Sequence, residues 1–184
     1  MMRRFRFVLI GLLMMGMAAC SKHSRSGQKP GNSHSKRKRL QGKYVMQNAT
    51  LIDILSHRKR VSKFAMALRA ADLVQYLQQN ALFTVFAPTN SAFDALPAKE
   101  FNRLMNRAGK EDLSRIVKYH IVKKPVHQSQ LKNGTILPTA EGDSLRITRK
   151  NGNIFVNGAK IVKGSVKVSN GIIYYIHKVL MPPH

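Results

Sequence analysis

The structural period changes within one short segment, Leu82-Phe83-Thr84-Val85-Phe86-Ala87-Pro88-Thr89-Asn90-Ser91-Ala92-Phe93. Residues 82–86 are almost all apolar, β-branched or aromatic, which is typical of a strand buried on both faces. Pro88 lacks a backbone N–H, so the strand should end there. Thr89 or Asn90 can then cap a helical turn that carries Phe93 on its inward side. The segment therefore predicts a corner that joins a buried strand to a capped helix.

Three parts of the sequence together resemble the fasciclin-type adhesion domain. Residues 84–93 resemble the first signature block of that family. A later segment resembles its second block: Asn170-Gly171-Ile172-Ile173-Tyr174-Tyr175-Ile176-His177-Lys178-Val179-Leu180-Met181-Pro182. Tyr119-His120 lies between them, where the family has a Tyr-His pair. Three blocks in the right order make a specific match over residues 48–182. The resemblance implies an α+β fold, a fasciclin-like wedge of two β-sheets with several short helices packed around it.

The periodicity of the other residues agrees with this fold class. Apolar residues recur at helical spacing in the first half, which predicts helices over residues 51–56 (capped by Thr50), 62–71, 72–79, after Pro97 and over 110–118. From Gly134 onward the period is two, with a hairpin signal at Asn151-Gly152 and a turn at Asn170-Gly171. Helices first and strands second are typical of α+β architecture. We expect a single core that contains Phe86, Phe93, Ile173, Ile176 and Val179.

Residues 1–19 have the features of a lipoprotein signal peptide. Residues 3–6 contain three arginines, and the uncharged apolar run that follows is shorter than the roughly 20 residues of a spanning helix. Small residues then precede Cys20, which resembles the lipobox of bacterial lipoproteins, with Met17 in place of the usual leucine. This resemblance implies that Cys20 is acylated and becomes the mature first residue. Ser21 and the lack of an acidic residue after Cys20 resemble the pattern of lipoproteins sorted to the outer membrane.

Residues 20–43 are predicted to form a basic, flexible tether between lipidated Cys20 and a fasciclin-like domain over residues 44–184. Residues 21–43 contain no acidic residue and almost no apolar one, so they cannot bury enough surface to offset their ordering entropy. The run Lys36-Arg37-Lys38-Arg39 can hold the tether against anionic head groups of its own membrane or against acidic glycans. Alternatively, this run is a solvated spacer. A signal peptide argues against a nuclear or nucleic-acid role for it.

No group of residues has the pattern of an active site. The eight carboxylates lie outside HExxH, glycine-rich phosphate-loop and GxSxG settings. The histidines lack metal-ligand spacing, and the single cysteine excludes an intramolecular disulfide. Glu111 and Asp112 fall in the first turn of an expected helix, where negative charge favours the helix dipole. We therefore expect no enzymatic activity, no cofactor and no metal.

Tyr119-His120 has two interpretations. The resemblance implies a binding role, because the Tyr-His region of some animal fasciclin domains has been linked to cell-surface receptors. The alternative is that both side chains pack inside the domain, where a buried imidazole must pair at least one nitrogen. We favour the packing interpretation.

The chain departs from the family pattern at two positions that often carry an aspartate. It has Gly164-Ser165-Val166 where many members have an Ala-Asp-Ile-like step. It also has Ile176-His177 where they have Ile-Asp. Both changes remove a carboxylate, which weakens the receptor interpretation.

The sequence is strongly basic. Its 32 lysines and arginines against eight acidic residues give a formal net charge of +24, or +21 once the three arginines of the signal peptide are removed. Such a field favours acidic partners, namely anionic lipid, lipopolysaccharide, an acidic polysaccharide or an acidic protein surface. Nucleic acid is a weaker match, because the sequence has no reader motif and no tryptophan.

These features predict an exported adhesion or interaction module that is lipid-anchored in a bacterial cell envelope, at the outer membrane. One alternative is a periplasmic carrier that holds a small apolar ligand between the helices and the sheets. Another is a polyanion- or nucleic-acid-binding protein, which would require a groove with exposed aromatic side chains between cations.

The position of Cys20 after an apolar run leads to a test of the anchor. Each buried acyl methylene contributes about 0.8 kcal/mol to membrane binding, so attachment through more than one chain is stable. We expect Cys20→Ser to give an unlipidated protein that is either uncleaved or released in soluble form. Cell fractionation and mass spectrometry of the mature chain measure this. Normal processing together with unchanged membrane fractionation would contradict the lipoprotein interpretation.

Overall fold

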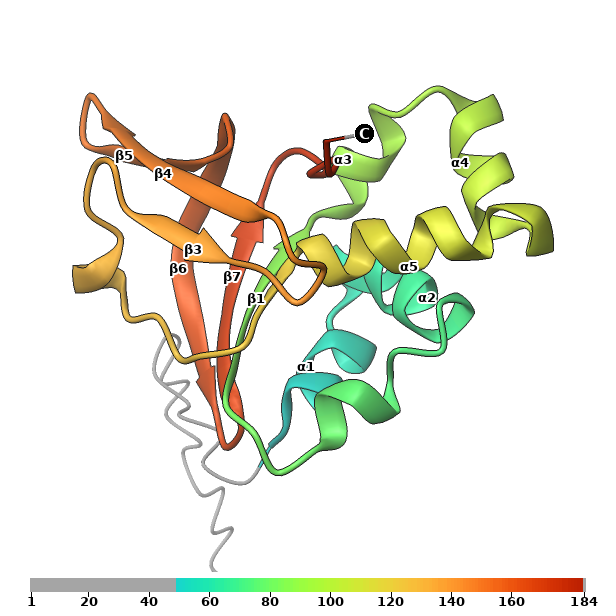
Figure 1. Ribbon diagram of the computed structural model, residues 1–184, viewed down its shortest axis with the longest axis horizontal. Helices are drawn as coiled ribbons and strands as arrows, with labels where there is room; N and C mark the ends of the chain where they lie inside the picture. Colours follow the sequence, from blue (N-terminus) through green and yellow to red (C-terminus); the bar gives the residue numbers. More distant parts are fainter. Residues whose placement is uncertain (1–48, 184) are drawn as a thin grey trace, which may run out of the picture. The chain divides into compact units, whose positions relative to one another are not determined.

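The computed structural model describes residues 49–183, with the α-helices and β1 in the first half and the other strands in the second (Figure 1). The α-helices are α1 (Leu51–His57), α2 (Ser62–Ala70), α3 (Asn90–Asp94), α4 (Ala98–Met105) and α5 (Lys110–Tyr119). Short 3-10 helices are η1 (Lys59–Val61), η2 (Gln75–Gln78), η3 (Arg107–Gly109) and η4 (Gln128–Gln130). The strands are β1 (Phe83–Pro88), β2 (Ile121–Val122), β3 (Ile136–Pro138), β4 (Ser144–Lys150), β5 (Asn153–Val156), β6 (Ala159–Val168) and β7 (Gly171–Ile176). The predicted α+β class is confirmed.

The helices form largely where the sequence predicts them. Thr50 caps α1, because its hydroxyl accepts from Asp53 N at 3.3 Å while the Asp53 carboxylate accepts from Thr50 N at 2.8 Å. The helix expected over residues 72–79 is wrong, since only η2 forms there. Asp72 adopts a φ of 55°, in the left-handed region, and a right-handed helix cannot continue through that conformation.

The seven strands form one hydrogen-bonded order, β2-β1-β7-β6-β5-β4-β3. All neighbouring pairs are antiparallel except β1 and β7, which are parallel. A bridge between Val122 and Thr139 brings the two ends of this order together, so the sheet curls almost into a barrel. In Figure 1 the helices lie on one side of β1 and β7, and β3, β4 and β5 lie on the other. The two layers of the expected wedge therefore belong to one continuous strand order.

The parallel pair β1–β7 lies at the centre of this order. Its register runs from Phe83 opposite Gly171 to Pro88 opposite Ile176, and every residue of both strands is buried. β1 ends with Pro88 as its last residue. The N–H of the next residue, Thr89, donates to Ile176 O at 3.0 Å. Leu82, which the sequence places in the strand, precedes it and is 50% exposed.

The corner after β1 is present, but its side-chain hydrogen bonds differ from those predicted. The Thr89 side chain does not cap α3, because its hydroxyl pairs with the Ser91 hydroxyl at 2.9 Å. Asn90 caps a different helix, since its Oδ1 accepts from Lys63 N in the first turn of α2 at 3.0 Å. The Asn90 amide also donates to Lys59 O at 2.8 Å. The corner is thus tied to the segment that begins α2.

The expectation of a single core is wrong, because the central strands separate two buried clusters. Successive side chains on a strand point to opposite faces. Phe93, Ile173 and Val179 pack with the helices, whereas Phe86 and Ile176 pack inside the curled sheet. The rings of Phe86 and its register partner Tyr174 are stacked with centroids 5.6 Å apart.

The turn between β6 and β7 holds the sheet to the helices. Asn170 Oδ1 accepts from Leu51 N and its amide donates to Leu77 O, both at 2.8 Å. Gly171 follows with no room for a side chain, because a Cβ there would lie 2.1 Å from Phe83 O. Asn170-Gly171 therefore forms the turn between β6 and β7. Asn170 bonds this turn to α1 and η2, and Gly171 lets β7 approach β1 closely.

Burial of β1 gives a test of the central pair. Phe86 is 0% exposed, and truncation of a buried phenylalanine costs about 3 to 5 kcal/mol. That is a large share of the roughly 5 to 15 kcal/mol that stabilises a domain. We expect Phe86→Ala to lower the melting temperature strongly or to abolish cooperative melting. Leu82→Ala, at the exposed end of the same segment, is the control and should melt nearly as the unchanged chain does. Equal melting of all three proteins would contradict this packing.

Candidate functional site

Tyr119 ends α5 and connects it to the strands. Its side chain is 3% exposed, and its hydroxyl donates to Ser144 O at 3.3 Å and accepts from Asn157 Nδ2 at 2.7 Å. Asn157 Oδ1 in turn accepts from Arg146 N at 2.7 Å. The hydroxyl of Tyr119 is therefore used inside the domain, between a helix end and β4.

His120 follows as the C-terminal cap of α5 and is 0% exposed. Its Nδ1–H donates to Ile116 O at 2.7 Å, and its Nε2 accepts from Leu180 N at 3.0 Å. The ring also packs against Phe64, with centroids 5.6 Å apart. Burial lowers the pKa of His120 to about 4. Both nitrogens are paired as a neutral imidazole, which is the geometry expected for the packing interpretation.

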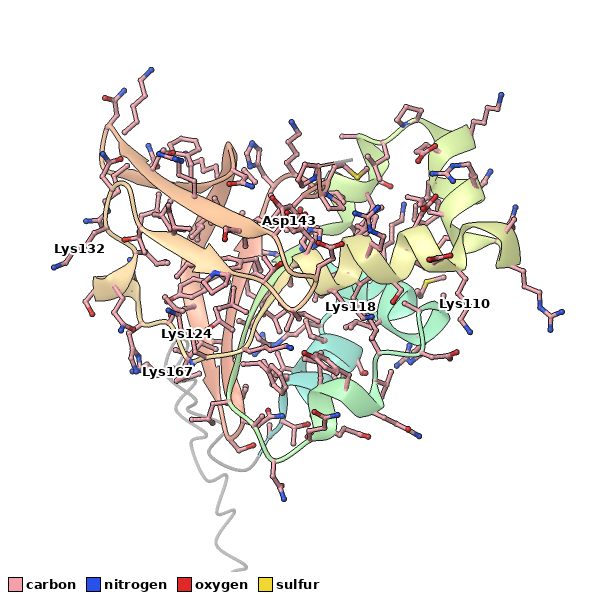
Figure 2. The ribbon with its side chains drawn as sticks, in the orientation of Figure 1. Lys110, Lys118, Lys124, Lys132, Asp143 and Lys167 are labelled. Atoms are coloured by element: carbon pink, nitrogen blue, oxygen red, sulfur yellow. The ribbon has the colours of Figure 1, made fainter. Side chains whose placement is uncertain are left out.

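Carboxylates are concentrated in the helical half of residues 49–183, whereas cations occur in both halves. The ion pairs in this range use cations from the helical half: Lys63–Asp94, Arg103–Glu100, Arg103–Asp112, Lys110–Asp72 and Arg115–Glu141. None of the described lysines and arginines after residue 120 forms an ion pair. Figure 2 shows three of them, Lys124, Lys132 and Lys167, on the strand side of the domain. The strand half therefore presents uncompensated positive charge.

An irregularity in β6 shapes this basic side. Ile161 lies opposite Ile176 and Ser165 lies opposite Tyr174, so β6 has two more residues than β7 between these pairs. A hollow of about 660 Å³, the first hollow, lies on one side of the irregularity and includes Arg149 and Lys160 in its lining. A hollow of about 470 Å³, the second hollow, includes Arg60 and His177. Val162 lines both, and no carboxylate among the described residues lines either one.

Arg149 occupies a position on β4 whose side chain, by the alternation along the strand, lies on the face that is buried in the core. On β4, Leu145 and Ile147 are 0% exposed and pack inside the curled sheet, and Arg149 is the next residue in the same row. Arg149 lies directly opposite Ile154 on β5, so the two side chains share a face. The row of buried side chains thus ends in an exposed cation at the first hollow.

Two hydrogen bonds join Lys160, which lines the first hollow, to His177, which lines the second. Lys160 N donates to His177 Nδ1 at 2.7 Å, and His177 N donates to Lys160 O at 3.2 Å. In the neutral ring, a proton-accepting Nδ1 leaves the proton on Nε2. In that tautomer Nε2–H is the donor of the His177 ring.

One of the two departures from the family pattern, His177, falls at this surface, and the other, Ser165, follows a residue that does. Gly164 lines the first hollow and His177 lines the second. The sequence alone did not single out Arg60, Arg149 or Lys160. The sequence pattern could have identified Arg149, because it is a cation at the third inward position of an alternating strand. No such pattern identifies Arg60 or Lys160. Cys20 and Lys36-Arg37-Lys38-Arg39 lie outside the described residues.

A third hollow, of about 220 Å³, differs in charge from the first two. Glu100, Arg103, Asp112 and Arg115 line it, and its charges are largely paired with one another. Asp112, expected near the helix dipole, accepts from Arg103 Nη1 at 2.7 Å. The hydrogen bonds to Glu100 and Asp112 raise the pKa of Arg103 above its usual range. This surface offers a partner little net charge.

The part of the chain that the structure describes contains no group of three or more His, Cys, Asp or Glu side chains placed to hold a metal ion. Nor does any helix in that part have the length and apolarity needed to cross a membrane.

The buried His120 predicts a pH dependence of stability. The pKa is about 6.5 when the chain is unfolded and about 4 when it is folded, so the unfolded chain binds a proton first as the pH falls. Stability should therefore decline between pH 6.5 and pH 4, by about 3 kcal/mol at most. His120→Gln keeps an acceptor for Leu180 N but cannot titrate, and should decline less over this range. Denaturant unfolding at several pH values measures the difference, and identical slopes for both proteins would contradict the prediction.

The chain is similar in sequence to a protein-family model and to several known proteins. A model of the Fasciclin domain matches residues 59–182. Protein sll1483 of Synechocystis is 37% identical over 134 residues, which cover 73% of this chain and 74% of that protein. Transforming growth factor-beta-induced protein ig-h3 of Sus scrofa is 32% identical over 82% of this chain and 23% of its own length. Cell surface glycolipoprotein MPB83 of Mycobacterium bovis is 40% identical over 55% of this chain and 44% of its own length.

A solved structure is similar in fold. The FAS1 domain pair of the insect cell adhesion molecule Fasciclin I superposes with a TM-score of 0.66 at 19% identity, covering 74% of this chain and 52% of that chain. This likeness confirms the fold that the sequence blocks implied. Because the domain model and the Synechocystis relative each cover most of the chain, the protein belongs to the fasciclin-domain family.

Proposed function

We propose that this protein is an exported, lipid-anchored fasciclin-domain protein that attaches a bacterial cell envelope to acidic surfaces without catalysing a reaction. The observation that carries this proposal is the uncompensated positive charge of the strand half, around the irregularity in β6. Relatives named as a cell adhesion molecule and as a cell surface glycolipoprotein support an adhesive role outside the cytoplasm. Acylation of Cys20 supplies the anchor, and the outer membrane is the proposed location.

The division of charge suggests how such a module works. Four cations of the helical half form ion pairs with the domain's own carboxylates, namely Lys63, Arg103, Lys110 and Arg115, whereas no described cation of the strand half does so. Their field steers an acidic surface from beyond contact distance, over a range of about 8 Å at physiological ionic strength. The tether, with Lys36-Arg37-Lys38-Arg39, adds a second basic segment near the anchor.

The structure offers less support for the alternative functions. A carrier of an apolar ligand would need an apolar site, yet the first hollow includes Arg149 and Lys160 in its lining. A single-stranded nucleic acid would need an exposed aromatic platform, and the aromatic residue of that hollow, Tyr174, is only 2% exposed. Binding of an acidic surface requires neither feature.

The salt dependence of binding tests the proposal. We expect the full chain in detergent to bind immobilised polygalacturonate, and the affinity to fall steeply with added salt because exposed charges are screened. Neutral galactan should bind far less. Deletion of residues 21–43 should weaken binding without abolishing it, whereas Tyr119→Phe, at a buried position, should have little effect.

Two results would overturn this proposal. One is binding that persists in high salt without residues 21–43, which would indicate recognition by a shaped surface of the domain. The other is a strong loss of binding in Tyr119→Phe with an unchanged melting temperature, which would favour the receptor-type role of Tyr119-His120.

A further inference from the structure

The first described residue, Ala49, is hydrogen-bonded to one end of the sheet. Its carbonyl oxygen accepts from Ser169 N and from Ser169 Oγ, both at 3.0 Å. In the same turn between β6 and β7, Asn170 O accepts from Phe83 N at 3.1 Å. Ala49, the β6–β7 turn and the beginning of β1 therefore meet at one end of the sheet, which we call the entry end. Figure 1 shows this turn and the segment before β1 together at the lower edge of the domain.

Strand register places three lysines at the entry end. Lys167 lies opposite Ile172, and Ile172 lies opposite Thr84, so Lys167 belongs to the same row as the beginning of β1. Thr84 Oγ1 donates to Lys124 O at 2.7 Å, which holds the residues after β2 beside that row. Lys123 joins Lys124 to β2. Figure 2 shows Lys124 and Lys167 on the lower part of the strand side.

These three lysines have little counter-charge at the entry end. Each is exposed, and none forms an ion pair with a described residue. Asp53 is a carboxylate that lines a hollow at this end together with Leu82 and Ser169. It accepts from Thr50 N and from Thr50 Oγ1, both at 2.8 Å, as part of the cap of α1. Lys123, Lys124, Lys167 and Asp53 together carry a net positive charge.

The entry end also exposes an apolar side chain. Leu82 is 50% exposed just before β1, and its neighbour Ala81 is exposed as well. Residues 78–80 are polar but uncharged. An apolar side chain next to lysines is typical of a surface that lies on a membrane, because the cations attract anionic head groups while the apolar group enters the interface.

The chain between the proposed anchor and the domain joins this same end. Residues 21–48 connect Cys20 to Ala49 and contain no acidic residue. An acylated Cys20 would therefore confine the entry end to the neighbourhood of its own membrane. Tethering of this kind raises the effective concentration of a surface near its partner, so that weak docking is sufficient.

We propose that the entry end docks on the anionic phospholipid head groups of the membrane that holds the anchor. Lys123, Lys124 and Lys167 contact the head groups, and Leu82 enters the interface. The inference rests on the proposed function, because it requires the anchor at Cys20. It also orients the domain, since Lys160 lies at the other end of β6 and is directed away from that membrane, towards an acidic partner.

Hydrogen–deuterium exchange tests the docking on the full chain. The acylated protein is reconstituted into vesicles of phosphatidylglycerol mixed with phosphatidylcholine, and into vesicles of phosphatidylcholine alone. We expect the amides of residues 79–82 and 123–124 to exchange several-fold more slowly in the anionic vesicles, because docking excludes water from them. The amides of residues 98–109 should exchange equally in both.

Two double variants with the same net charge identify the residues responsible. Lys124→Gln/Lys167→Gln should weaken the docking equilibrium about thirtyfold and so abolish the slowing. The matched control, Lys99→Gln/Arg107→Gln, removes exposed cations from α4 and η3, which follow the opposite end of β1, and neither forms an ion pair with the described residues. It should leave the slowing intact. Melting temperatures confirm that both variants fold.

The outcomes separate this inference from the proposed function. Equal exchange in the two kinds of vesicle, or equal loss of the slowing in both variants, would overturn the docking of the entry end while leaving salt-sensitive binding of polygalacturonate intact. Slowing of the same amides by polygalacturonate, but not by phosphatidylglycerol, would assign this end to the acidic partner instead and would also overturn the inference. An unchanged chain that is acylated but does not bind polygalacturonate would overturn the proposed attachment alone.

Discussion

The parallel pairing of β1 with β7 is the constraint on which the rest of the described domain depends. These strands come from the two signature blocks, far apart in sequence, and both are buried along their whole length. One face packs against the helices and the other fills the curled sheet. Gly171 permits the close approach, since a side chain there would collide with Phe83 O. The apolar composition of both blocks is thus explained by packing on two faces at once.

The buried centre limits where a partner can bind. Tyr119 and His120 use their polar atoms to join α5 to β4 and to the segment after β7, so their hydrogen bonds hold together the helical and strand layers. A residue locked in this way contributes mainly to stability. Recognition is left to the outer surface, where the cations of the strand half have no carboxylate partners among the described residues.

The charged side chains are distributed unevenly between the helical half and the strand half of the described domain. Carboxylates occur mostly in the helical half and form exposed ion pairs there, which contribute little to stability. The strand half combines exposed lysines and arginines with an irregular strand that opens two hollows. His177 lines the second hollow, and its ring accepts a hydrogen bond from Lys160 N, which holds β6 next to the end of β7 before the irregularity. The carboxylates and their ion pairs are thus concentrated in the helical half, and the described cations of the strand half lie outside these pairs.

The sequence by itself determined the α+β class, the corner at Pro88, the Thr50 cap and the Asn-Gly turns, because each depends on neighbouring residues and on local periodicity. It did not determine that Phe86 and Phe93 lie in different cores, because the face of each residue is set by strand pairing. It also did not show that Asn90 caps α2, a helix that precedes it by many residues. Arg149 and Lys160 line one hollow beside β6, and Arg60 lines another, only in the folded chain. The tertiary structure decided their positions, because Arg60 lies in η1, Arg149 on β4 and Lys160 on β6, and only strand pairing and helix packing bring these elements together.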